Sequence, residues 1–296
     1  MIGATGRTET PISRRHFSPD ILAISPSLLK EGDNVLTVEL ISDPPGLGFL
    51  APPQLGPYEP LALARDRAHF VSVTLTQIMA VAVLILGVVI IVLWRARVWA
   101  PAYAYFAAIC LIWPLHMSNR FWTDPPFPAF IWERIIFLAA FWMGVLGVLF
   151  ALRLARLKTP ASPRLILMAG AIVSAVFLIL PFSTFMAWAQ FGMTPATITL
   201  AALTAAILVF HSWRRRDQGA LLYSITGTAM ATSAALDAAN LLRPSGGMMV
   251  FSLQYTAVFA VGGLGVMLIN QFISASREAG ELNRSLESRL KEKERQ

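Results

Sequence analysis

The chain has 296 residues, of which 56% are hydrophobic and only 14% are charged, and its formal net charge is +7. Soluble domains carry about 25% charged residues, so this composition excludes an ordinary soluble domain and indicates an integral membrane protein. The positive charge does not indicate a nucleic-acid-binding protein, because the basic residues cluster between apolar runs and in the tail, as in the cytoplasmic loops of membrane proteins.

Residues 1–69 are predicted to be an extracytoplasmic segment of a β-sandwich. In "NVLTVELIS", Leu36, Val38 and Leu40 fall on one face and polar residues such as Glu39 on the other, a period-two pattern typical of a half-buried strand. The preceding "EGDN" is a tight-turn signal. Two or three strands form a poor independent core, so we predict that this segment is part of a larger sandwich.

Seven apolar runs approach or exceed the roughly 20 residues that a membrane-spanning helix needs. The stretch between Arg164 and Arg214 has no charge and is too long for one helix. We divide it at "PFSTFMAWAQFGMTP", where Pro181, Gly192 and Pro195 predict a loop. The predicted spans, which together form a bundle over residues 70–273, are 71–94, 98–118, 129–152, 165–188, 196–213, 220–242 and 248–273.

The short loops predict the orientation of these spans. Lys and Arg are frequent after the first, third and fifth spans, for example in the arginine cluster 214–216, and they are sparse in the other three loops. Because cytoplasmic loops carry the excess of Lys and Arg, the N-terminus is predicted outside and the C-terminus inside. The sixth span also has small residues four apart, at Gly227, Ala231, Ala235 and Ala239, which predicts a helix central to the bundle.

Residues 274–296 are predicted to form a charged cytoplasmic helix. Apolar and small residues follow 3-4 spacing, which predicts either a parallel coiled-coil dimer or, more simply, a solvated helix end. The residues of this seam are Phe272, Ala275, Ala279, Leu282 and Leu286.

The order of these segments resembles the bacterial seven-transmembrane receptors with diverse intracellular signalling modules. The residues that carry the resemblance are "LLKEGDNVLTVEL", "LGPYEPL" before the first span, the seven spans, and "ELNRSLESRLKEKERQ". The resemblance implies a sensory receptor in the bacterial inner membrane, a homodimer through its C-terminal helix, and a histidine kinase or diguanylate cyclase output domain beyond Gln296. It also implies a small extracytoplasmic ligand, with a carbohydrate-like ligand suggested by the jelly-roll-like strand.

Six polar residues are the candidate ligand-binding residues, because ionisable groups inside a membrane are costly and mark functional sites. All are predicted in the outer leaflet, where Asp237 is expected to pair with Arg134 or Arg120. The simpler interpretation is that they lie at the interface and reach water. These residues are His116, Arg120, Glu133, Arg134, Asp237 and Asn240.

The sequence has no pattern that predicts a catalytic or metal site. The four histidines, at positions 16, 69, 116 and 211, show no metal-ligand spacing, and neither GxSxG nor a phosphate-binding loop occurs. We therefore expect no cofactor in this chain. The alternative function is a small-solute transporter or channel, which requires polar residues or broken helices near the middle of the bilayer.

Overall fold

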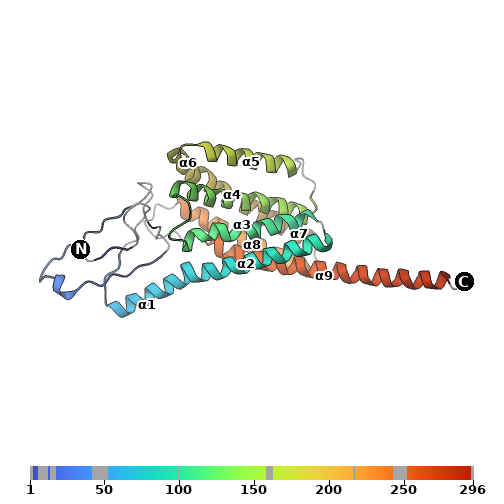
Figure 1. Cartoon of the computed structure of the whole chain (residues 1–296), viewed down its shortest axis with the longest axis horizontal. Coiled ribbons are helices and arrows are strands. Elements are labelled where there is room, and N and C mark those ends of the chain that lie inside the picture. Colours follow the sequence, from blue (N-terminus) through green and yellow to red (C-terminus); the bar gives the residue numbers. More distant parts are fainter. Residues whose placement is uncertain are drawn as a thin grey trace.

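The computed structural model describes residues 3–5, 13, 18–41, 53–98, 100–157, 163–215, 218–242 and 252–294. It is an elongated helical bundle, with the described N-terminal residues at one end and a long helix leaving the other end (Figure 1). The helices are α1 Tyr58–His69, α2 Leu75–Leu93, α3 Pro101–Phe121, α4 Ala129–Leu154, α5 Pro163–Ile179, α6 Phe182–Trp188, α7 Thr194–Arg215, α8 Gln218–Leu242 and α9 Leu253–Glu294.

Two of these helices are continuous with their neighbours. A short π-helical segment at Phe70–Thr74 joins α1 to α2, and another at Ala189–Met193 joins α6 to α7. Four helical stretches are long and apolar enough to cross a membrane: Tyr58–Ala96, Ala129–Leu154, Phe182–Arg214 and Tyr255–Lys293. Helix α5 is a shorter apolar helix. The all-helical bundle is thus confirmed among the described residues, whereas the count of seven spans stays a prediction.

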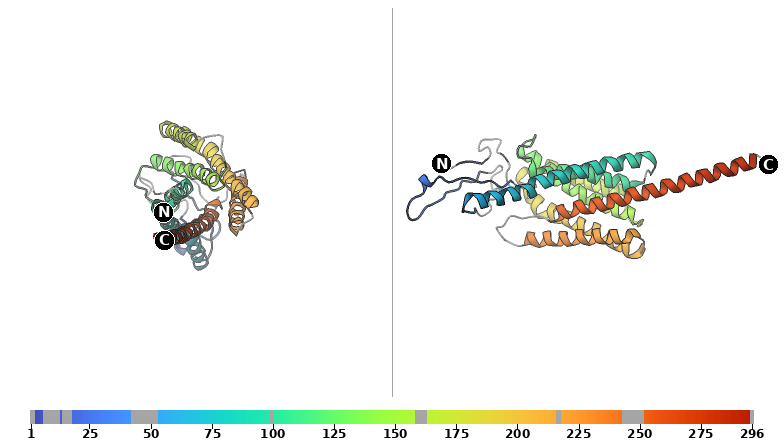
Figure 2. Two further views of the ribbon diagram at one scale, coloured as in Figure 1. Left: turned by 90° about the vertical axis from the view of Figure 1, so that its right-hand side faces the viewer. Right: turned by 90° about the horizontal axis from the view of Figure 1, so that it is seen from below.

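The core of the bundle surrounds α3. Phe106, Cys110 and Trp113 on this helix are buried, and they pack in one cluster with residues of α2, α4, α7 and α9 such as Ile90 and Phe150. Helix α9 lies beside α2 and α8 (Figure 2). Helix α8 packs mainly on α7 and then on α9, so it does not lie at the centre of the bundle as predicted.

The predicted loop between the fourth and fifth spans is wrong. The helix is interrupted at Leu180–Pro181, and residues 182–188 begin the next helical stretch. Gly192 lies in the π-helical segment and Pro195 is the second residue of α7, so neither interrupts the helix. Proline has no backbone N–H to donate in the interior of a helix. Pro195 follows the wider π-helical segment and lies in the first turn of α7, where the missing hydrogen bond is tolerated.

The predicted N-terminal strand is not confirmed. Residues 33–41 form no strand pairing within the described part of the chain, and Val35, Val38 and Leu40 are exposed. The predicted domain boundaries at residues 69/70 and 273/274 both fall within continuous helix. They stay predictions about topology rather than breaks in secondary structure.

Candidate functional site

The carboxylate of Asp237 is tied to the start of α9. Asp237 lies on α8 with only 1% of its surface exposed, and its Oδ1 accepts hydrogen bonds from the Ser252 backbone N–H at 2.7 Å and the Ser252 hydroxyl at 2.9 Å. Ser252 immediately precedes α9. A carboxylate at a helix N-terminus is stabilised by the unpaired N–H groups there, so these bonds offset part of the cost of burying the charge.

A chain of hydroxyl groups extends this contact. The Ser233 and Thr256 hydroxyls lie 2.6 Å apart, and Thr256 also donates to the Ser252 carbonyl at 3.2 Å. The Ser252 hydroxyl makes a longer 3.3 Å contact with the Ser233 carbonyl. These bonds join α8 to the first turn of α9.

Arg120 reaches the same place from α3. Its guanidinium donates to the Tyr255 hydroxyl at 3.3 Å and lies 5.7 Å from the centre of the Tyr255 ring. The Asp237 carboxylate is within electrostatic range of this guanidinium. The structure therefore places both predicted residues at the start of α9, Arg120 on Tyr255 and Asp237 on Ser252, and their direct pairing stays a prediction. We call the residues from α3, α8 and α9 that meet here the α9-start cluster: Arg120, Ser233, Asp237, Ser252, Tyr255 and Thr256.

Other predicted site residues have different neighbours. Arg134 donates to the carbonyls of Leu178 and Leu180 at the end of α5, and it stacks over Phe185, so it is not the partner of Asp237. The His116 Nδ1 donates to the Ile136 carbonyl of α4 at 3.2 Å.

The other two candidates, Glu133 and Asn240, lie on α4 and α8. Glu133 is half-buried beside Arg134, and the Asn240 side chain lies outside what the structure describes.

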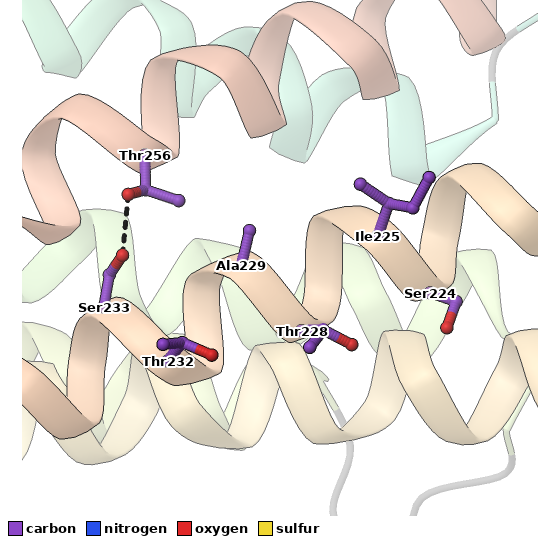
Figure 3. A pocket seen from close by; sticks show the side chains of 7 residues that line it. All are labelled: Ser224, Ile225, Thr228, Ala229, Thr232, Ser233 and Thr256. Carbon is purple, nitrogen blue, oxygen red and sulfur yellow. Dashed lines mark hydrogen bonds between the residues drawn. The ribbon is translucent and has the colours of Figure 1, made fainter.

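A shallow open groove of about 550 Å³ follows α8 away from the cluster. Figure 3 shows Ser224, Thr228 and Thr232 along α8, with Thr256 of α9 bonded to Ser233 at one end of the groove. The groove lining is small and hydroxylated. Within the described residues, no group of three or more His, Cys, Asp or Glu side chains is placed to hold a metal ion.

Sequence reasoning missed four members of the α9-start cluster: Ser233, Ser252, Tyr255 and Thr256. Uncharged hydroxyl residues are common in membrane helices and carry little signal by themselves. A serine directly before an apolar helix is nevertheless a helix-cap signal. That signal could have placed Ser252 at the start of α9, although not opposite Asp237.

Comparison with known protein families finds a match for most of the helical bundle. A family model described as "7TM diverse intracellular signalling" matches residues 73–271, which run from the start of α2 into α9. No curated protein and no solved structure matches the chain significantly. The match covers more than half of the chain and includes all residues of the α9-start cluster. The chain therefore belongs to the family of seven-transmembrane receptors with diverse intracellular signalling modules and is a transmembrane sensory module.

Proposed function

We propose that this chain is the membrane part of a bacterial receptor that relays an extracytoplasmic or membrane signal to a cytoplasmic output domain, such as a histidine kinase or a diguanylate cyclase. It would lie in the inner membrane as seven spans, with the N-terminus outside and the C-terminus in the cytoplasm. The observation that carries this proposal is the continuity of α9, which runs unbroken from the α9-start cluster into the charged C-terminal rod.

The dimensions of α9 suit a relay. Its 42 residues span about 63 Å at 1.5 Å per residue, roughly twice the hydrocarbon thickness of a bilayer. Within the bundle α9 packs against α8 and α2, and beyond the bundle its side chains are exposed. Helix α9 therefore provides one continuous path from the α9-start cluster, where its first turn is held, to the exposed rod.

The exposed rod is the proposed site of homodimerisation. Leu282 and Leu286 are 60% and 48% exposed, although they occupy seam positions of a coiled coil. A parallel dimer would cover both leucines and place two output domains side by side. The remaining proposed partners are membrane lipids around the bundle and a small ligand, of carbohydrate-like class, on the outer side.

The α9-start cluster is the proposed input site. A ligand changes signalling only if it binds two arrangements of the helices with different affinity. The bonds from Asp237 to Ser252 supply a contact that two such arrangements would make differently, because they join separate helices and involve a charge. Ligand binding near this cluster would therefore shift the position of α9 relative to α8.

The test is a fusion of residues 1–296 to a diguanylate cyclase domain, with cyclic dinucleotide production measured in bacterial membranes. We expect Asp237→Asn to change the basal output roughly fivefold, because neutral hydrogen bonds are about half as strong as charge-assisted ones. The matched control is Asp66→Asn, whose side chain is 62% exposed beside Arg65 and should leave the output unchanged. Equal output from wild type, Asp237→Asn and Asp237→Ala, at equal membrane levels, would refute the relay.

A further inference from the structure

The face of α9 that is buried in the bundle continues as the seam of the exposed rod. In an α-helix, residues separated by 18 positions lie about five full turns apart and therefore on the same face. Four buried residues each have a seam residue at this separation. The pairs are Ala257 with Ala275, Val261 with Ala279, Leu264 with Leu282, and Leu268 with Leu286.

The opposite face shows the same continuity. Phe259 and Val266 are 74% and 57% exposed on the lipid side of α9. Arg277 and Arg284 follow them at the same separation, on the exposed rod. The rod therefore presents basic residues on the side that faces lipid higher up, and apolar residues on the side that faces the bundle.

The buried face of α9 points into the bundle. The Tyr103 hydroxyl of α3 donates to the Leu268 carbonyl at 3.0 Å. On the two flanks, Gly265 lies against Leu86 of α2 and Gly263 against Leu222 of α8. Since α9 leaves the bundle as one continuous helix (Figures 1 and 2), the seam faces the space directly beneath α2, α3 and α8.

This direction conflicts with pairing of two straight helices. Packed helices lie about 8–10 Å apart. A second copy of the rod seated on the seam would, if straight, continue upward into the volume that α2, α3 and α8 of the first copy fill. Two parallel copies therefore cannot pair side by side along the seam while both α9 helices stay straight and keep their places in their bundles.

We propose that α9 is hinged at Ser274–Gly280, so that two rods bend toward each other below their separate bundles. This inference rests on the paired rod of the proposed function. The segment lies just beyond Phe272, the last seam residue that is partly buried, and it holds Ser274, Ser276 and Gly280, which are weaker helix formers than alanine. A Cβ atom at Gly280 would meet no atom within 4 Å, so packing does not require glycine there.

The experiment measures disulfide formation between copies of the full chain in membranes. The background is Cys110→Ala, because Cys110 is the one cysteine of the sequence. Single cysteines are placed on the seam, as Leu282→Cys or Leu286→Cys, and on the opposite face, as Arg284→Cys. We expect fast cross-linking at both seam positions and slow cross-linking at position 284.

Gly280→Ala then tests the hinge. Replacing an interior helix glycine by alanine stabilises the straight helical conformation by about 0.5–1 kcal/mol. We therefore expect seam cross-linking to slow by about twofold to fivefold, which is this free energy expressed as a ratio of populations. The matched control is Gly262→Ala in the same helix, where a Cβ atom also meets nothing within 4 Å and where no change is expected.

Three results would overturn the hinge. Seam cross-linking that is unchanged or faster in Gly280→Ala would show that pairing needs no bend, while the paired rod itself would stand. Fastest cross-linking at position 284 would show that straight helices pair through the basic face. Absence of cross-linking at all three positions would remove the paired rod of the proposed function together with the hinge.

Discussion

At the scale of single residues, Arg134 and Asp237 show how two charged residues predicted for one site have different roles. Both were predicted to belong to one polar pocket. Asp237 meets the start of α9, whereas Arg134 binds carbonyl groups at the end of α5 and lies beside the aromatic cluster around Phe185. The planar guanidinium of Arg134 suits this task, because it donates two hydrogen bonds to two different carbonyls at once.

We expect Arg134→Lys to lower the stability of the protein by about 1.5–3 kcal/mol, because a lysine ammonium does not reproduce the planar fork of charge-assisted bonds to Leu178 and Leu180. Thermal unfolding in detergent micelles would measure the loss. Arg277→Lys, on the exposed rod, is the matched control and should unfold like the wild type. Equal unfolding of the two variants would show that the Arg134 fork contributes no stability.

The sequence located one residue pair of the site and could not locate the rest. Asp237 and Arg120 stand out because charges are rare in apolar helices. Their hydroxyl partners do not stand out, since Ser233 and Thr256 look like ordinary small residues of membrane helices. Which residues face each other across helices depends on rotation about each helix axis, and composition does not determine that rotation.

At the scale of elements, small residues indicate close approach without indicating which helix approaches. Gly227 was predicted to lie on a packing face of α8, and a Cβ atom there would lie 2.8 Å from Val209 Cγ2 and 2.9 Å from the Ala205 carbonyl oxygen of α7. Ala235 of the same predicted face is exposed. The pattern thus identified a real contact between α7 and α8 but extended it too far along the helix.

We expect Gly227→Ala to destabilise the protein by about 1–3 kcal/mol, because the added methyl group overlaps backbone atoms of α7 that cannot move aside. Gly262→Ala, in open space on α9, should be neutral or slightly stabilising. Denaturation of both variants in mixed micelles provides the measurement. A Gly227→Ala protein as stable as the wild type would mean that α7 and α8 separate easily.

At the scale of the whole molecule, the long apolar helices and the charged C-terminal rod could be predicted from the pattern of apolar and charged residues. The position of the break before α6 did not, because proline marks either a loop or the start of a new helical register, and local sequence does not choose between them. Residues 18–41 form no strand pairing within the described part of the chain, so alternation alone could not establish a sandwich.

Orientation is tested by labelling single cysteines in the Cys110→Ala background with a membrane-impermeant maleimide. We expect Leu55→Cys to react in intact spheroplasts, because Leu55 is exposed and precedes the first predicted span. Ser285→Cys, on the exposed rod, should react only after the membrane is opened. Reaction of both cysteines from the same side would exclude an odd number of spans.

Helix α5 is attached to the bundle mainly through α4, by features such as the bond from Trp142 Nε1 to the Ser174 hydroxyl at 2.9 Å. It lies at the edge of the bundle (Figure 1), and its outward side chains include Leu165, Met168 and Ile172. Its 17 residues span about 26 Å, less than the roughly 30 Å of an average hydrocarbon layer. In the predicted topology α5 crosses the membrane, and this mismatch would make the adjacent lipids compress or the helix shift, so that bilayer thickness would affect this edge of the bundle.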